Sequence, residues 1–385
     1  MLSPRHVVVL GATGSIGDSA TKVARALPQQ MKIVGLSGHN NQTRLLELAR
    51  EFQPLALCTQ TETCAELLKK ELSEKSIFPT IYHGAEGLLA LATMPKADLV
   101  LVAISGTTGL LPSLAALKAG KDLAVASKEI LVMAGEEVMA TAAVHHRKIL
   151  PVDSEHSAVF QCLEGRDPST IRRIILTCSG GPFRATPAAD LIQVTPEMAL
   201  RHPTWNMGKK ISIDSATLFN KGLEMIEAHF LFNVPMEKIE VIIHPESIIH
   251  SMVEFVDGSI IAQMSHNNMM HPIQYAVTYP HRVANSCSYL DLASIGRLNF
   301  EAPRCDVFPA LDLARRAGTL GGTMPAVLNA ANETAVALFL EGQITFPDIW
   351  KKVEHAMNTI PLVEHPSLEE IIAADQAARK LVASD

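Results

Sequence analysis

The sequence has few charged and few aromatic side chains. Of its 385 residues, 19% are Asp, Glu, Lys or Arg and 5% are Phe, Trp or Tyr, with only two tryptophans. The formal net charge is −7 at pH 7, and such a chain lacks the basic surface that binds nucleic acid. With 48% hydrophobic residues, the composition is that of a globular protein whose length allows more than one domain. We expect no nucleic-acid partner.

Motifs that depend on cysteine or on long apolar runs are also missing. None of the six cysteines forms a C-x-x-C pair, which argues against a zinc ribbon or a redox motif and predicts reduced thiols. No apolar run approaches the length of about 18 residues that spans a membrane. The first apolar strand is reached by Val7, which leaves no room for a signal peptide. We therefore expect a cytoplasmic protein without a membrane partner.

A glycine-rich turn follows the first strand. His6 to Leu10 is apolar, Gly11-Ala12-Thr13-Gly14-Ser15-Ile16-Gly17 comes next, and a helical pattern runs from about Asp18 to Leu27. Strand, glycine turn and helix in this order are typical of dinucleotide binding, with the pyrophosphate at the helix amino terminus. The spacing is G-x-x-G-x-x-G, and a tight turn without ligand is the alternative.

The end of the second strand, at Ser37, has no acidic residue. An NAD enzyme usually places one there to hold the ribose 2′-hydroxyl. Ser37, His39 and Asn40 are uncharged and rich in hydrogen-bond donors, so the pattern favours NADP(H). Further strand–helix alternation up to about residue 150 predicts a doubly wound, Rossmann-like sheet.

Lys128 follows a short strand at residues 123–126. Ligands of such sheets bind beyond the carboxyl ends of the strands, so Lys128 is a candidate functional residue. A solvated lysine paired with Glu129 is the alternative.

Two carboxylates follow the apolar run that ends at Val152. If the backbone stays extended, Asp153 and Glu155 point to one face. Two carboxylates so placed suit a hard divalent cation, which prefers oxygen ligands. The alternative is a polar turn.

The middle of the chain carries three further candidate segments. Ser179-Gly180-Gly181 follows a strand at 171–177 and can expose backbone N–H groups to an anion, or be an ordinary turn. Residues 201–210 contain Trp205 in a polar segment, which predicts a lid or a surface loop.

Residues 213–230 have a helical pattern, so that Asn220, Lys221 and Glu224 share one side of a helix. Glu224 is then a third candidate carboxylate for the cation. Candidate phosphate ligands are Ser215, Asn220 and Lys221. A surface pair of Lys221 and Glu224 is the alternative.

The remaining segments carry no catalytic cluster. Strands are predicted at 239–243 and 259–264 with 251–256 between them, and Asp257-Gly258 predicts a hairpin turn. His244, His250, His266 and His271 match no metal spacing and are interpreted as structural. Helices are predicted at 309–317, 325–341, 347–358 and 367–383. The expected domains are 1–150, a catalytic domain at 151–280 with the lid near 201–210, a linker at 281–304 and a helical domain at 305–385.

Taken in order, these segments resemble the 1-deoxy-D-xylulose 5-phosphate reductoisomerase family over essentially the whole chain. The stretches that carry the resemblance are Gly11 to Gly17, Ala126 to Glu129, Pro151 to Ser157, Ser179 to Phe183, His202 to Gly208 and Asn220 to Glu224. The resemblance implies an NADPH-dependent enzyme that rearranges and reduces 1-deoxy-D-xylulose 5-phosphate to 2-C-methyl-D-erythritol 4-phosphate. It implies a homodimer and a small phosphorylated sugar as substrate.

The resemblance also implies roles for individual residues. Mg²⁺, Mn²⁺ or Co²⁺ would be bound by Asp153, Glu155 and Glu224. The substrate would be contacted by Lys128, Ser154, Glu155, Ser179, His202, Trp205, Ser215, Asn220 and Lys221. NADPH would be contacted by Gly11, Thr13, Gly14, Ser15, Ile16, Gly38, His39, Asn40, Ser127, Glu129 and Gly208. His39 and Ser127 depart mildly from the family pattern, in which a basic residue and Asn are common.

Two other functions would share the amino-terminal pattern. An NADP oxidoreductase of the homoserine-dehydrogenase type would use the same nucleotide fold without needing three carboxylates for a metal. A nucleotide-sensing protein would bind NADPH without turnover, and it would have no need of Lys128, the carboxylates and the lid together.

Overall fold

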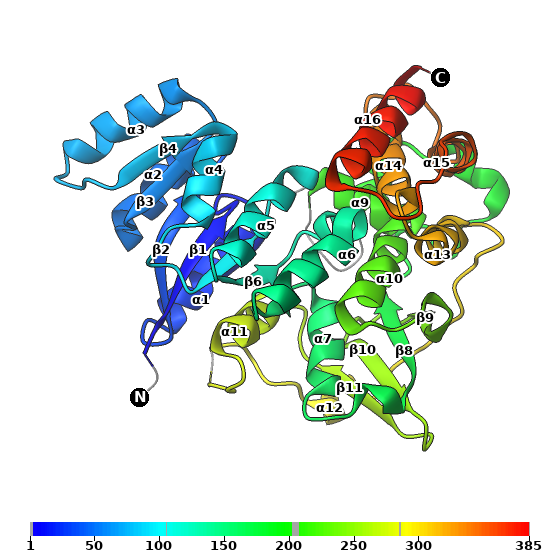
Figure 1. Cartoon of the computed structure of the whole chain (residues 1–385). Helices are drawn as coiled ribbons and strands as arrows, with labels where there is room; N and C mark the ends of the chain where they lie inside the picture. Colours follow the sequence, from blue (N-terminus) through cyan, green and yellow to red (C-terminus); the bar gives the residue numbers. More distant parts are fainter. Residues whose placement is uncertain (1–2, 105, 202–207, 285, 385) are drawn as a thin grey trace. The chain divides into compact units, whose positions relative to one another are not determined.

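The chain divides into two compact units, each with its own β-sheet. The computed structural model describes residues 3–104, 106–201, 208–284 and 286–384 (Figure 1). The first unit comprises Met1–Ile130, Glu137–Ser157 and Asn268–Ser288, and the second comprises Leu131–Glu136, Ala158–Asn267 and Tyr289–Asp385. In the described part of the chain, no helix combines the length and the apolar character needed to cross a membrane.

The first unit is built on a seven-stranded sheet in which all paired strands are parallel. Its strands are β1 Arg5–Leu10, β2 Met31–Ser37, β3 Ala56–Thr59, β4 Thr80–His83, β5 Leu99–Val102, β6 Asp122–Val125 and β7 Ile149–Pro151. Their order is β4-β3-β2-β1-β5-β6-β7. The strand sequence changes direction between β1 and β5, which is where doubly wound sheets bind ligands. The predicted Rossmann-like fold is confirmed.

Helices connect these parallel strands. They are α1 Ser15–Ala26, α2 Gln42–Phe52, α3 Glu62–Ser73, α4 Gly84–Ala92, the short η1 Thr107–Gly109, α5 Leu110–Lys118 and α6 Glu129–Val144, of which residues 131–136 group with the second unit. Helix α11 Met270–Thr278, from later in the chain, also belongs to the first unit. Helix α11 packs beside α1, and α4 packs beside α5. Residues Val7, Val8, Val9 and Leu10 of β1 are fully buried, because a central parallel strand is covered on both faces.

The second unit contains a four-stranded mixed sheet in the order β11-β10-β8-β9. Its strands are β8 Ile171–Cys178, β9 Ile239–Ile243, β10 Ile249–Phe255 and β11 Ile260–Met264. Strands β8 and β9 are parallel, and β10 is antiparallel to both β8 and β11. The predicted hairpin turn is confirmed between β10 and β11, where Gly258 has a φ of +84°.

The other elements of the second unit are helices. They are α7 Ser154–Leu163 (whose first turn belongs to the first unit), η2 Pro168–Thr170, η3 Ala188–Gln193, α8 Pro196–Ala199, α9 Lys209–Thr217, α10 Phe219–Phe232, η4 Met236–Lys238, α12 Leu292–Ile295, α13 Ala310–Leu320, α14 Met324–Leu340, α15 Asp348–Thr359 and α16 Leu368–Ser384. The last four lie where the sequence predicts helices (Figure 1).

One hydrophobic core joins the four-stranded sheet to the carboxyl-terminal helices. Phe219 of α10, Val253 of β10 and Phe339 of α14 belong to the same cluster of buried residues. The predicted domain limits at residues 150, 280 and 304 stay predictions. The structure adds that residues on both sides of 281–304 contribute to this core, and that residues 281–288 group with the first unit.

Two local predictions are wrong. Residues 213–230 form two helices, α9 and α10, because Leu218 between them adopts a left-handed conformation with φ +67°. The Leu218 side chain is 3% exposed, so burial in the core offsets the cost of this backbone conformation. Asp153 and Glu155 are also not on extended backbone, since α7 begins at Ser154 and Ser157 N–H donates to the Asp153 carbonyl at 2.8 Å.

Candidate functional site

The glycine turn after β1 has the backbone geometry of a nucleotide-binding loop. Gly11 has φ +89°, and a Cβ there would lie 2.4 Å from the carbonyl oxygen of Ala103, just beyond β5. At Gly17 a Cβ would lie 2.3 Å from the Ala12 carbonyl oxygen. These two glycines therefore allow close packing of the turn against β5 and of α1 against the turn.

Gly14 serves a different purpose, because a Cβ there would meet nothing closer than the Gly11 carbonyl oxygen at 3.5 Å. It precedes the first residue of α1 and provides no side-chain cap, and both Gly14 and Ser15 are exposed. The amino terminus of α1 is thus accessible, and its N–H groups and dipole favour an anionic phosphate.

Ser37 at the end of β2 stabilises this turn through a hydrogen bond. Its hydroxyl accepts a hydrogen bond from Gly11 N–H at 2.9 Å, and its side chain is buried. Of the three residues Ser37, His39 and Asn40 that the sequence groups together, Ser37 is thus the buried one. His39 and Asn40 are exposed, and Gly38 lies close to Thr13, whose methyl carbon would be 3.0 Å from a Cβ at Gly38.

Arg44 in the first turn of α2 was not predicted from the sequence. Its guanidinium lies 3.1 Å from Asp18 in the first turn of α1 and 2.9 Å from Glu47. An arginine near the end of the second strand is how doubly wound domains accommodate a 2′-phosphate. The signal in the sequence was an arginine shortly after the His39-Asn40 pair, at the start of a predicted helix.

Two further predicted nucleotide residues follow β6. The Ser127 hydroxyl donates to the Ile104 carbonyl, and Ser127 is 5% exposed. Glu129 is the first residue of α6 and is 8% exposed. Ser127 thus ties the segment after β6 to the segment after β5, at the carboxyl edge of the sheet.

Lys128 and Asp153 form a buried ion pair in the first unit. Lys128 Nζ lies 2.7 Å from Asp153 Oδ2, and their side chains are only 6% and 12% exposed. They are brought together because β6 and β7 are adjacent, with Val125 paired to Pro151. The alternative reading of Lys128 as a solvated lysine is wrong.

Asp153 and Glu155 also lie close together. One carboxylate oxygen of each lies within 4.8 Å of the other, and the Ser154 hydroxyl donates to Glu155 Oε2 at 2.7 Å. The buried His156 has Nδ1 4.0 Å from Asp153 Oδ1. These two carboxylates can offer oxygen ligands to one divalent cation from the start of α7.

The second unit contains another buried lysine–carboxylate pair, on α10. Lys221 Nζ forms an ion pair with Glu224 Oε2, and the two side chains are 3% and 1% exposed. Asn220 Nδ2 donates to Glu224 Oε1 at 2.5 Å. The prediction that these three residues share one side of a helix is confirmed. The alternative of a surface pair is wrong, because both residues are buried.

The Ser-Gly-Gly turn after β8 packs against the end of α9. Gly180 and Gly181 have φ values of +83° and +69°, and Gly181 N–H donates to the Ser179 hydroxyl at 3.3 Å. A Cβ at Gly181 would lie 2.7 Å from the Ser215 carbonyl oxygen. The second unit therefore places the turn that carries Ser179 directly beside the helix that carries Ser215.

Four predicted residues remain to be placed. Ile16 is the second residue of α1 and is partly buried. His202 and Trp205 lie outside the described residues. Gly208 is exposed and directly precedes α9.

Comparison with known proteins identifies the family. Sequence models match residues 7–135, described as 1-deoxy-D-xylulose 5-phosphate reductoisomerase, residues 149–232, its C-terminal domain, and residues 264–381, described as DXP reductoisomerase C-terminal domain. The chain is 51% identical to the 1-deoxy-D-xylulose 5-phosphate reductoisomerase of Pelotomaculum thermopropionicum over 98% of this chain and 97% of that protein. Its identity to the same enzyme of Symbiobacterium thermophilum is 52%, over 97% of each.

The chain belongs to the 1-deoxy-D-xylulose 5-phosphate reductoisomerase family.

Solved structures of this family have the same fold. The enzyme of Zymomonas mobilis in complex with NADPH is 42% identical, covers 99% of each chain and superposes with a TM-score of 0.92. A DOX-P reductoisomerase in complex with NADPH, fosmidomycin and magnesium is 40% identical, covers 99% of this chain and 98% of that one, and has a TM-score of 0.94.

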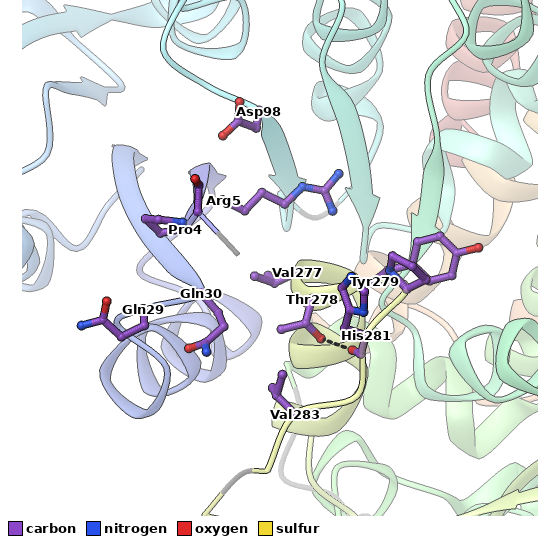
Figure 2. A pocket seen from close by; sticks show the side chains of 12 residues that line it. Pro4, Arg5, Gln29, Gln30, Asp98, Val277, Thr278, Tyr279, His281 and Val283 are labelled. Atoms are coloured by element: carbon purple, nitrogen blue, oxygen red, sulfur yellow. Dashed lines mark hydrogen bonds between the residues drawn. The ribbon is translucent and has the colours of Figure 1, made fainter. Parts of the chain in front are cut away.

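A cavity of about 670 Å³ lies elsewhere in the first unit (Figure 2). It is lined by Arg5 at the start of β1, by Gln29 and Gln30 before β2, and by residues at the end of α11 and just beyond it. Arg5 forms an ion pair with Asp122 and donates to the Ala276 carbonyl at 3.1 Å. This cavity lies at the amino ends of the strands, opposite the edge that carries Gly11 and Lys128, so we do not assign the reductoisomerase site to it.

Proposed function

We propose that this chain catalyses the NADPH- and divalent-metal-dependent rearrangement and reduction of 1-deoxy-D-xylulose 5-phosphate to 2-C-methyl-D-erythritol 4-phosphate. It would thereby act in non-mevalonate isoprenoid precursor biosynthesis. The observation that carries this proposal is the relatedness over nearly the full chain to reductoisomerases, one of which was solved with NADPH, fosmidomycin and magnesium. The buried lysine–carboxylate pairs at the predicted positions support it.

The residues of the glycine turn fit NADPH. The accessible amino terminus of α1 suits the pyrophosphate, and we assign contacts with the cofactor to Gly11, Thr13, Gly14, Ser15, Ile16, Gly38, His39, Asn40, Ser127, Glu129 and Gly208. NADPH supplies the hydride for the reduction. Arg44 would add the positive charge that His39 lacks when neutral, which favours NADPH over NADH.

The carboxylates fit a divalent cation by the chemistry of their donors. We assign Asp153, Glu155 and Glu224 as ligands of Mg²⁺, with Mn²⁺ or Co²⁺ as alternatives. The bound cation polarises the oxygen atoms of the substrate that gain charge during the rearrangement. Ser154 keeps Glu155 oriented through their hydrogen bond, and we expect its hydroxyl also to contact the substrate.

Lys128 and the residues of the second unit would bind the substrate. The Lys128 ammonium, held beside Asp153, can donate to an oxygen of the sugar. Ser179, Ser215, Asn220 and Lys221 would hold the phosphate, because hydroxyl, amide and ammonium donors suit an anion. Phosphate bound away from the reacting carbons provides binding energy for orientation. His202 and Trp205 would cover the substrate and exclude water.

The decisive experiment is to follow NADPH absorbance with purified protein, 1-deoxy-D-xylulose 5-phosphate and Mn²⁺, with and without a chelator. We expect oxidation of NADPH that requires both the substrate and the metal. Activity that survives the chelator would favour a homoserine-dehydrogenase type of oxidoreductase, and NADPH binding without turnover would favour a nucleotide sensor.

We also propose that the protein is a cytoplasmic homodimer. Strand β11 is an edge strand of the four-stranded sheet, and its Ile260 is 51% exposed, which supports a further contact at this edge. The six cysteines form no disulfide in the described structure, in keeping with a reducing compartment. Sedimentation analysis of the purified protein tests the dimer, and a mass of one chain, about 41.6 kDa, would contradict it.

A further inference from the structure

Asp214 on α9 is a buried carboxylate to which the proposed reaction assigns no role. It is 1% exposed, and its two oxygens have separate partners. Lys210, one turn earlier on the same helix, has Nζ 2.9 Å from Oδ2, and Asn332 on α14 donates from Nδ2 to Oδ1 at 2.8 Å. The buried charge is thus stabilised by one ammonium group and by one amide from a distant helix.

The buried amide of Asn332 is unfavourable for the free energy of folding at its position. It is fully buried, and its Oδ1 has no hydrogen-bond partner among the described residues. A buried amide with one unsatisfied atom costs free energy that an apolar side chain of similar size would not. The benefit that offsets this cost is the hydrogen bond from its Nδ2 to Asp214.

Asp214 directly precedes Ser215, a proposed phosphate ligand, on α9. Asp214 and Ser215 are consecutive on a helix, so their side chains lie about 100° apart around its axis. Asn332 holds α9 from one direction, and Gly181 packs against the Ser215 carbonyl from another. Rotation of α9 about its axis would break the hydrogen bond between Asn332 and Asp214 and would change the distance between Gly181 and the Ser215 carbonyl.

We infer that Asn332 and Asp214 are positioning residues for the substrate phosphate: the α14 amide fixes the Asp214 carboxylate, and Asp214 fixes the face of α9 that carries the Ser215 hydroxyl. This inference rests on the proposed function, in which Ser215 binds that phosphate. Neither residue touches the substrate. Lys210 belongs to the same arrangement, since its ammonium neutralises Asp214.

The test compares Asn332→Ala with Asn329→Ala. Asn329 is a matched control, because it lies one turn earlier on α14, is also fully buried and also has an Oδ1 without a partner in the described structure. Its Nδ2 points to Glu333, at 3.4 Å, and not to Asp214. Three constants are measured on the NADPH-loaded enzyme: KM for substrate, kcat, and the inhibition constant of inorganic phosphate.

We expect Asn332→Ala to raise KM and the phosphate inhibition constant by about tenfold, as for one lost hydrogen bond to a charged group, with a smaller change in kcat. NADPH affinity should not change. Asn329→Ala should change neither phosphate-dependent constant by more than about twofold. Equal effects of the two variants on phosphate inhibition would overturn the inference.

A second pair of variants covers the case in which Asn332→Ala does not fold. Asp214→Asn keeps an oxygen that can accept from Asn332, so phosphate inhibition should stay within about threefold of the unchanged protein, whereas Asp214→Ala should weaken it about tenfold. Similar constants for the two would contradict the inference. Ser215→Ala separates it from the proposed function: if that change leaves phosphate inhibition unaltered, the phosphate site itself is wrongly assigned.

Discussion

The two units each bury one lysine against one carboxylate, but they assemble these pairs differently. Lys221 and Glu224 are three residues apart on α10, so the helix alone makes them neighbours. Lys128 and Asp153 lie 25 positions apart and meet only because β6 and β7 are adjacent in the sheet. The comparison shows that equivalent chemistry can rest on local periodicity in one unit and on sheet topology in the other.

The two pairs should also fail in different ways. Removal of one partner of a buried ion pair strongly destabilises the folded protein, because the other charge stays buried without compensation. In the second unit the helix would still hold the remaining residue in place. In the first unit the position of the remaining residue depends on the order of the segments after β6 and β7.

The largest effect is expected from the carboxylates. Glu224→Gln removes a proposed metal ligand from the second unit, and Asp153→Asn removes one from the first. Loss of residues that merely support metal ligands typically costs 10- to 100-fold, so each change should lower turnover by at least about a hundredfold. NADPH binding, measured by fluorescence titration, should be unchanged in both. If metal affinity and turnover both survive Glu224→Gln, the metal assignment is wrong.

The next largest effects are expected from substitution of the two buried lysines, which should affect different kinetic constants in the two units. Lys221→Met removes a proposed phosphate ligand and should raise KM for the substrate by about tenfold or more, with kcat less affected. Lys128→Met removes the donor beside Asp153 and should act mainly on kcat. Steady-state kinetics at saturating Mn²⁺ measures both variants. If the two variants changed KM and kcat in the same proportion, Lys221 and Lys128 would not have the separate roles in phosphate binding and catalysis that we propose.

A substitution of Arg44 tests the cofactor preference of the first unit separately from substrate binding by the second. Arg44→Gln removes the only charged guanidinium that the structure places between the first turns of α1 and α2 in the described first unit. We expect the preference for NADPH over NADH in kcat/KM to fall by about tenfold. The phosphate inhibition constant reports on the second unit and should not move. If the cofactor preference did not change, His39 and Asn40, and not Arg44, would be the residues that bind the 2′-phosphate.

The smallest effect concerns the sheet of the second unit in acid. The hydrogen bond from Arg173 holds the pKa of Glu254 below its ordinary value of 4.5, although burial opposes this. A lowered carboxyl pKa contributes stability that is present above the ordinary value and is lost as the pH falls through the folded-state pKa. Below about pH 4.5, the thermal midpoint of the unchanged protein should therefore fall more steeply with pH than that of Glu254→Gln.

Glu240→Gln is the matched control for that measurement. Glu240 pairs with the same Arg173, at 2.5 Å, but its side chain is 48% exposed while that of Glu254 is 6% exposed. An exposed pair contributes little to stability, so the control should keep the pH dependence of the unchanged protein. Equal slopes for both variants would show that Glu254 is not the group responsible.

Much of the fold was predictable, because parallel strands and amphipathic helices leave periodic signals in the sequence. The four carboxyl-terminal helices were predicted within a few residues of their limits. The break at Leu218 was not, because a leucine with φ +67° is stable only when the core buries its side chain. No propensity of the residues around it indicates that break.

The sequence by itself determined the strand–helix alternation of the first unit, the four carboxyl-terminal helices, where the glycine turn lies, and that Asn220, Lys221 and Glu224 share a helix side. Each of these follows from spacing along the chain. Only the tertiary structure decided that Lys128 meets Asp153, that Ser37 braces Gly11, and that Asn332 reaches Asp214. These contacts join residues at least 25 positions apart, so they depend on which elements pack together, and no local periodicity encodes that choice.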